Sequence, residues 1–199
     1  MENGKIAFGW RWSRKEIENY LIDPTVVSRS LGTTAPSPVD YLRLLEVAAD
    51  KICFYQTART ALGNCRRRFS DLPSNWGRRR GRDDHPFPDD VTDMGCKAGI
   101  GQVVTDHGVE QTITSAEVLA RYNDLLPTFI ASGPRRLDFM WTFAGKDLLV
   151  SMEKDLTSYG FASVAVFCER VLLGIERTAD DIGAWLPEWA ALRSAVQSF

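Results

Sequence analysis

Cysteine and histidine are scarce in this sequence. Its 199 residues include four cysteines and two histidines, and no two cysteines form a Cys-x-x-Cys pair. This scarcity argues against a structural zinc site, and we expect reduced thiols in a cytoplasmic protein. The sequence also lacks an apolar run near the roughly 20 residues of a membrane-spanning helix. Its N-terminus lacks the long apolar core of a signal peptide.

The chain also lacks a strong excess of positive or negative charge. The chain has 24 Lys and Arg against 26 Asp and Glu, a formal net charge of -2, so no global basicity points to nucleic acid. The hydrophobic fraction of 44% is ordinary for a protein with a core. Because the length suits one domain and no internal repeat is visible, we expect residues 1–199 to form a single domain.

The apolar pattern predicts a mostly helical chain with a few short strands. The expected helices cover residues 14–21, 24–31, 39–68, 115–131, 146–159, 161–175 and 178–196. We expect strands at 6–12 and 136–143, where aromatic and apolar residues gather. Residues 63–112 hold Gly, Pro, Asp and Arg with little periodicity, which predicts an irregular, basic insertion. A strand, turn and helix at each end favours an α/β fold with a partial sheet.

The most distinctive run lies at residues 10–24, WRWSRKEIENYLIDP. Ser13 stands three residues before Glu16, the spacing of a capping box at the start of a helix. The run resembles a segment of TOPRIM nucleases related to the OLD (overcoming lysogenization defect) family. The resemblance is clearest over Trp10–Leu31 and is weaker over Phe143–Leu149.

This resemblance implies the C-terminal part of a TOPRIM-like domain, from a nuclease of anti-phage defence. Such an enzyme cleaves DNA or RNA phosphodiester bonds with Mg²⁺ or Mn²⁺. By resemblance, Glu18 would be a metal ligand and Lys146 a catalytic residue that stabilises charge on a phosphate oxygen. The alternative for Glu18 is a solvated helix acid. Two members of one such site should lie within about 10–12 Å of each other.

The acidic residues that such a site also needs are missing from the chain. The family carries a glutamate and an Asp-x-Asp pair on preceding strands, and no Asp-x-Asp occurs here. Glu18 and Lys146 alone cannot hold two metals, so we expect the isolated chain to be inactive. Activity would need ligands from another segment or a partner chain, for example one linked to an ATPase. The alternative is a non-catalytic module that binds a protein or nucleic acid.

Arginines gather in two clusters within the expected insertion. They are Arg66, Arg67 and Arg68, then Arg78, Arg79, Arg80 and Arg82. Interleaved aromatic residues, Phe69 and Trp76, would stack on bases while the arginines contact phosphates, which predicts nucleic-acid binding. The alternative is a solvated face, or pairing with the acids at 71, 83, 84, 89 and 90. The acids and histidines of 83–107 could hold a metal, but turn formation is their commoner role.

Overall fold

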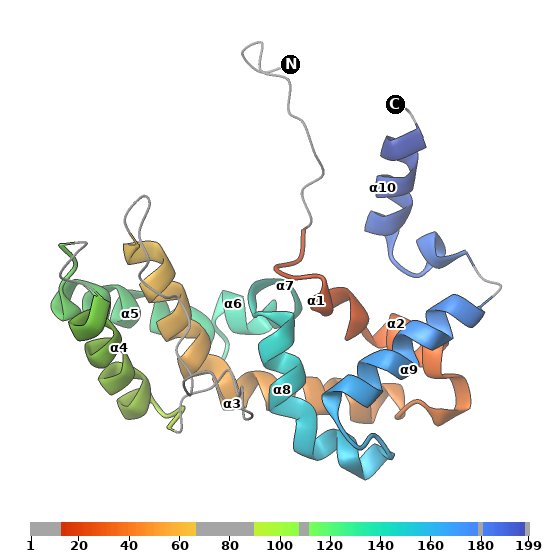
Figure 1. Cartoon of the computed structure of the whole chain (residues 1–199), viewed down its shortest axis with the longest axis horizontal. Helices are drawn as coiled ribbons and strands as arrows, with labels where there is room; N and C mark the ends of the chain where they lie inside the picture. The colour runs from red at the N-terminus through yellow and green to blue at the C-terminus, as the bar shows by residue number, and fades with distance from the viewer. Residues whose placement is uncertain (1–12, 67–89, 108–111, 179–180, 198–199) are drawn as a thin grey trace.

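Every regular element of the described chain is a helix (Figure 1). The computed structural model describes residues 13–66, 90–107, 112–178 and 181–197. Its α-helices are α1 (Glu18–Leu21), α2 (Pro24–Leu31), α3 (Pro38–Cys65), α4 (Asp93–His107), α5 (Ser115–Phe129), α6 (Pro134–Leu137), α7 (Phe139–Thr142), α8 (Gly145–Leu156), α9 (Val164–Arg177) and α10 (Pro187–Gln197). Short 3₁₀ turns are η1 (Gly32–Thr34), η3 (Thr157–Tyr159) and η4 (Ile182–Ala184). The expected α/β fold with a partial TOPRIM-like sheet is therefore wrong for these ranges.

The expected strand at 136–143 is instead the pair of short helices α6 and α7. Pro134 occupies the first turn of α6, where its fixed φ favours a helix. Phe139 and Phe143 are buried, while Trp141 between them is 46% exposed. Residues four apart lie on one helical face, so burial follows the helical period and not the alternation of a strand. The strand expected at 6–12 lies outside the described residues.

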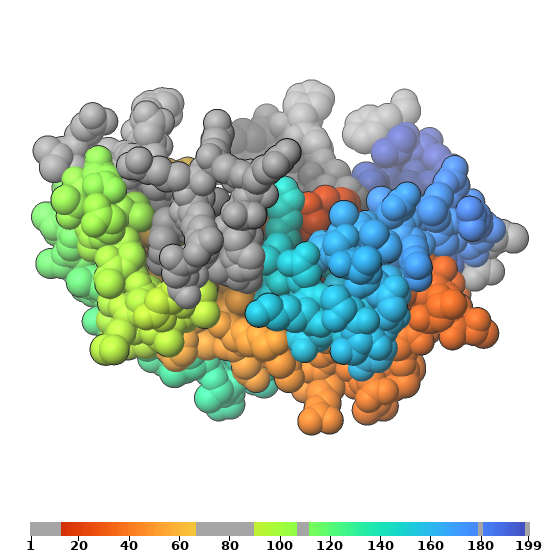
Figure 2. All heavy atoms as spheres, turned by 60° about the horizontal axis from the view of Figure 1, so that its bottom comes forward, coloured from red at the N-terminus to blue at the C-terminus, as the bar shows by residue number. Residues whose placement is uncertain are grey.

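Helix α3 is the centre of the fold. Ser37 caps it by accepting a hydrogen bond from the Asp40 N–H at 3.2 Å, and Pro38 occupies its first turn. The helix is 28 residues long and carries buried side chains from Tyr41 to Cys65. It packs against α4 and α5 at one end of the molecule, and against α2 and α8 at the other (Figure 1). Figure 2 shows α4, α3 and α8 side by side on one face.

Helix α4 lies within the stretch expected to be irregular. It begins behind Thr92, whose hydroxyl accepts a hydrogen bond from the Gly95 N–H at 3.2 Å. Its buried residues are Cys96, Ile100, Val103 and Val104, which share one helical face against α3 and α5. The glycines between them hide this period in the sequence.

Two further expectations concern thiols and membranes. None of the four cysteines forms a disulfide. In the described ranges no single helix is long and apolar enough to cross a membrane, although α8 with η3 and α9 pass that test as a pair bent by 79°.

Helices α1 and α8 touch through their backbones at Gly145. A Cβ atom built on Gly145 would lie 2.5 Å from the Asn19 nitrogen and 2.8 Å from the Glu18 carbonyl carbon. Only glycine permits this approach, because a side chain would force the two segments apart.

We therefore expect Gly145→Ala to lower the free energy of unfolding by about 2 kcal/mol or more. Gly101→Ala is the matched control, because nothing lies within 4 Å of a Cβ at this position inside α4. It should raise stability by about 0.5–1 kcal/mol, since alanine favours helix more than glycine does. Urea denaturation followed by circular dichroism measures both. Equal effects of the two substitutions would contradict the close packing of α1 on α8.

Candidate functional site

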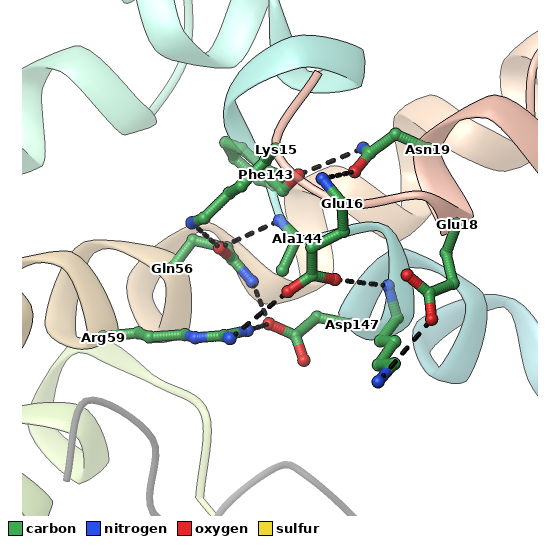
Figure 3. A network of polar contacts seen from close by, with 10 residues as sticks. Lys15, Glu16, Glu18, Asn19, Gln56, Arg59, Phe143, Ala144 and Asp147 are labelled. Atoms are coloured by element: carbon green, nitrogen blue, oxygen red, sulfur yellow. Dashed lines mark hydrogen bonds and ion pairs between the residues drawn. The ribbon is translucent and has the colours of Figure 1, made fainter. Parts of the chain in front are cut away.

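The segment around Glu16 crosses the start of α8 and caps it (Figure 3). The Glu16 carboxylate accepts a hydrogen bond from the Lys146 N–H at 3.2 Å. A carboxylate is favourable there because helix N-termini carry partial positive charge and unsatisfied N–H groups. The Glu16 N–H itself donates to Asn19 Oδ1 at 3.0 Å.

The expected capping box between Ser13 and Glu16 does not form. The Ser13 N–H and hydroxyl both donate to the Glu188 carboxylate of α10, each at 2.6 Å. Helix α1 consequently begins at Glu18 and not at the expected Arg14. Glu188 also accepts a hydrogen bond from the Tyr20 hydroxyl, so this carboxylate joins α10 to the N-terminal segment.

Other residues of the distinctive run point into the fold. Asn19 is fully buried and donates to the carbonyls of Met140 and Phe143, at 3.0 and 3.1 Å. The buried Arg14 guanidinium lies between the rings of Tyr20 and Trp141, 4.9 and 4.7 Å from their centroids. It also forms an ion pair with Asp23 at 2.5 Å. These contacts give the residues of the run a structural role, which is to hold α1 against α7 and α8.

An ion-pair network joins α3, α8 and Glu16 (Figure 3). Asp147, whose side chain is 3% exposed, accepts hydrogen bonds from Arg59 and Gln56, both at 2.5 Å. Arg59 also lies 3.4 Å from Glu16. Burial raises the pKa of the Asp147 carboxyl, and the Arg59 guanidinium partly offsets that rise.

Gln56 connects the network to the turn before α8. Its side-chain oxygen accepts from the Ala144 N–H at 3.3 Å and from Lys15 Nζ at 3.5 Å. Burial of the ammonium group, and then the nearby Arg59, lower the pKa of Lys15. Perturbed groups in one cluster mark a candidate functional site, although structural ion pairs produce the same shifts.

The two residues expected to share a catalytic centre do lie together. Lys146 Nζ is 3.6 Å from Glu18 Oε1, so the expected proximity is confirmed. The expected sheet edge is wrong, because Glu18 starts α1 and Lys146 lies in the first turn of α8. Lys146 is 69% exposed in its side chain and Glu18 is 20% exposed. Their roles as catalytic residue and metal ligand remain predictions.

Most of the expected nucleic-acid contacts lie outside the described residues. Arg66 ends α3, where its N–H donates to the Leu62 carbonyl at 3.1 Å. The positions not described are Arg67, Arg68, Arg78, Arg79, Arg80 and Arg82. The same holds for His85 and the acids at 83, 84 and 89, whose side chains are possible metal ligands.

The sequence did not single out Asn19, Gln56, Arg59 or Asp147 as parts of the site. For Gln56 and Arg59 the sequence does offer a signal. These two polar residues are three apart in a largely apolar stretch of α3, so they lie on the same side of the helix.

Across the described ranges, no group of three or more His, Cys, Asp or Glu side chains could hold a metal ion. Comparisons with protein-family models, with curated proteins and with solved structures find no match.

The Arg59–Asp147 pair generates a pH-dependent prediction. Arg59→Met leaves a buried carboxylate without its cation, which should cost about 3 kcal/mol near neutral pH. A carboxyl whose pKa is higher in the folded state loses stability as pH rises through that pKa. The variant should therefore be closest to the parent at about pH 4–5 and furthest from it at about pH 8. Urea denaturation across this range measures the difference.

Two variants serve as controls. Adding Asp147→Asn to Arg59→Met should abolish the extra pH dependence, because the carboxylate is gone. Lys51→Met breaks an ion pair with Asp155 in which both side chains are more than 40% exposed. It should change stability by no more than about 0.5 kcal/mol. A pH-independent loss in Arg59→Met would show that reduced packing, and not charge, is responsible.

Proposed function

We propose that this chain is a non-catalytic module that binds nucleic acid through the arginine-rich segment 66–82. This segment holds seven arginines and one acid, Asp71, and so carries a charge of +6 in a chain of net charge -2. This local excess is the observation that carries the proposal. Arginines release counterions when they contact phosphates, which gives binding that ignores base sequence and weakens with salt.

Two acids that follow the segment, Asp90 and Asp93, have partners within the described fold. Asp90 accepts a hydrogen bond from the Thr92 N–H at 2.9 Å, and bonds from Thr92 lower the pKa of Asp90. Asp93 pairs with Lys97 at 2.8 Å and accepts from the Tyr122 hydroxyl at 2.8 Å. These two carboxylates therefore have partners other than the arginines, which supports a segment of net positive charge.

Segment 66–82 begins directly after the well-packed C-terminal end of α3. Arg66 directly follows α3, whose last turns bury Ala61, Leu62 and Cys65.

The Glu16 carboxylate near Lys146 supports a non-catalytic role, since one of its oxygens accepts from the start of α8 and the other contacts Arg59. Glu16 therefore has a structural role in joining α8 to the rest of the fold.

The Glu18–Lys146 contact supports a second candidate, part of a Mg²⁺- or Mn²⁺-dependent nuclease completed by another segment or chain. If Glu18 is a metal ligand, Mn²⁺ should raise the melting temperature of the parent but not of Glu18→Gln. The binding-module proposal expects no such difference. Both candidates expect no cleavage of plasmid or single-stranded DNA by the isolated chain, so the shift in melting temperature with Mn²⁺ is the measurement that separates them.

Reversing the charge of three arginines tests the primary proposal. Arg78→Glu, Arg79→Glu and Arg80→Glu together should weaken binding to all DNA sequences alike. The log–log dependence of affinity on salt should become shallower by about 0.9 for each duplex phosphate that the variant no longer neutralises. Fluorescence anisotropy with two unrelated duplexes, at several salt concentrations, measures both quantities.

The matched control replaces the same three residues with lysine. It preserves charge, so backbone binding should largely persist, because lysine also neutralises phosphate. Parent-like affinity in the triple glutamate variant would show that the cluster is only a solvated face. Discrimination between the two duplexes would contradict sequence-independent binding.

A further inference from the structure

A pocket of about 250 Å³ lies between the N-terminal part of α3 and the end of α8 with η3. Helices α3 and α8 lie side by side in the fold (Figure 2). The pocket is smaller than the roughly 300–1,000 Å³ of sites for drug-sized ligands, so it suits a smaller molecule. The described residues that line it are Asp40, Arg43, Leu44, Val47, Asp155, Ser158 and Tyr159.

Local interactions hold both walls of this pocket. The Ser37 hydroxyl donates to Asp40 Oδ2 at 2.6 Å and accepts from the Asp40 N–H at 3.2 Å, which orients the carboxylate in the first turn of α3. On the opposite wall, Gly160 ends η3 in the left-handed conformation, with φ at 82°. The Gly160 N–H donates to the Thr157 carbonyl at 3.1 Å, which closes the turn that carries Tyr159. Helical segments, and not a long loop, therefore form the described walls.

The lining contains one charge of each sign that lacks an ionic partner in the described structure. Asp155 pairs with Lys51 at 2.7 Å, which leaves Asp40 and Arg43 as the other charged residues of the lining. Within the described ranges, the Arg43 guanidinium has no hydrogen-bond or ion-pair partner, and the Asp40 carboxylate bonds only with Ser37. Asp40 and Arg43 are three apart on α3, so both charges lie on the same side of the helix.

Apolar surface lies beside these two charges and is partly open to water. Val47 is 41% exposed and Tyr159 is 36% exposed, whereas Leu44 is buried. A ligand that covers Val47 and Tyr159 gains binding free energy, because it removes apolar surface from water. The pocket thus combines a cation, an anion and an apolar wall within a small volume.

We propose that this pocket binds a free α-amino acid with an apolar side chain. Such a molecule is a zwitterion, and its two charges match the two that lack an ionic partner here. The Arg43 guanidinium holds the α-carboxylate, for which its planar fork is suited. The Asp40 carboxylate accepts a hydrogen bond from the α-ammonium group. The side chain of the ligand then lies against Leu44, Val47 and Tyr159.

Isothermal titration calorimetry of the full chain with L-leucine and three analogues tests the proposal. L-leucine should bind with a dissociation constant of about 1 mM or lower. Leucinamide lacks the carboxylate, 4-methylpentanoate lacks the ammonium group, and glycine lacks the apolar side chain. Each analogue should bind at least about tenfold more weakly than leucine, because each leaves one part of the pocket unmatched.

A substitution in the lining provides a second measurement. Arg43→Gln should weaken leucine binding by at least about tenfold, because the carboxylate loses its charged hydrogen bonds. Arg43 is exposed, so the substitution should leave the fold intact, and circular dichroism checks this. Arg177→Gln is the matched control, because Arg177 is an exposed helical arginine of α9 outside this lining. It should bind leucine as the parent does.

Several results would overturn the proposal. These are no leucine binding at about 10 mM ligand, unchanged leucine affinity in Arg43→Gln, or an analogue that binds as tightly as leucine. Equal binding of leucinamide would assign the pocket to the N-terminus of a peptide instead. The proposal rests on residues outside segment 66–82, so the variant with glutamate at Arg78, Arg79 and Arg80 should still bind leucine. The nucleic-acid and amino-acid proposals therefore fail separately.

Discussion

The buried side-chain amide of Asn19 is the interaction on which the arrangement around α8 depends. It accepts from the Glu16 N–H and donates to the carbonyls of Met140 and Phe143, so it bonds three backbone groups at once. Aspartate would offer only acceptors to those carbonyls, and an apolar residue would satisfy none of the three groups. With Asn19 in place, the Glu16 carboxylate reaches the start of α8 and Gly145 meets the backbone of α1.

Charged groups at the centre of the described fold neutralise one another. Arg59 pairs with Asp147 and Glu16, and the desolvation of these three groups is tolerable because each has a partner. Seven arginines gather instead in segment 66–82, which begins where α3 ends. The near-neutral total charge of the chain therefore conceals one strongly basic segment of the sequence.

Elements with strong local signals could be predicted from the sequence. Asp23-Pro24 predicts the start of α2, and the long apolar periods of α3 and α9 identify helices. The strand predicted at 136–143 was wrong because aromatic residues are common in both strands and buried helices. Packing against the rest of the fold, which the local sequence does not show, decides between the two. The capping box failed because Glu188, 175 residues away, takes both Ser13 donors. The closeness of Glu18 and Lys146 was predicted from a resemblance and not from a local pattern. The Arg59–Asp147 pair could not be predicted, because its members are 88 residues apart and leave no local pattern in the sequence.

The attachment of α10 has a consequence for the order of folding. None of its described residues is fully buried, and it is held chiefly through Glu188, through Trp189 against Tyr20, and through its own preceding turn η4. The Ser13–Glu188 bonds close a loop of 175 residues, whose entropic cost is offset only after the core has brought the two ends close. Helix α10 should therefore dock last and open first, as a unit whose amide hydrogens exchange well before those of α3.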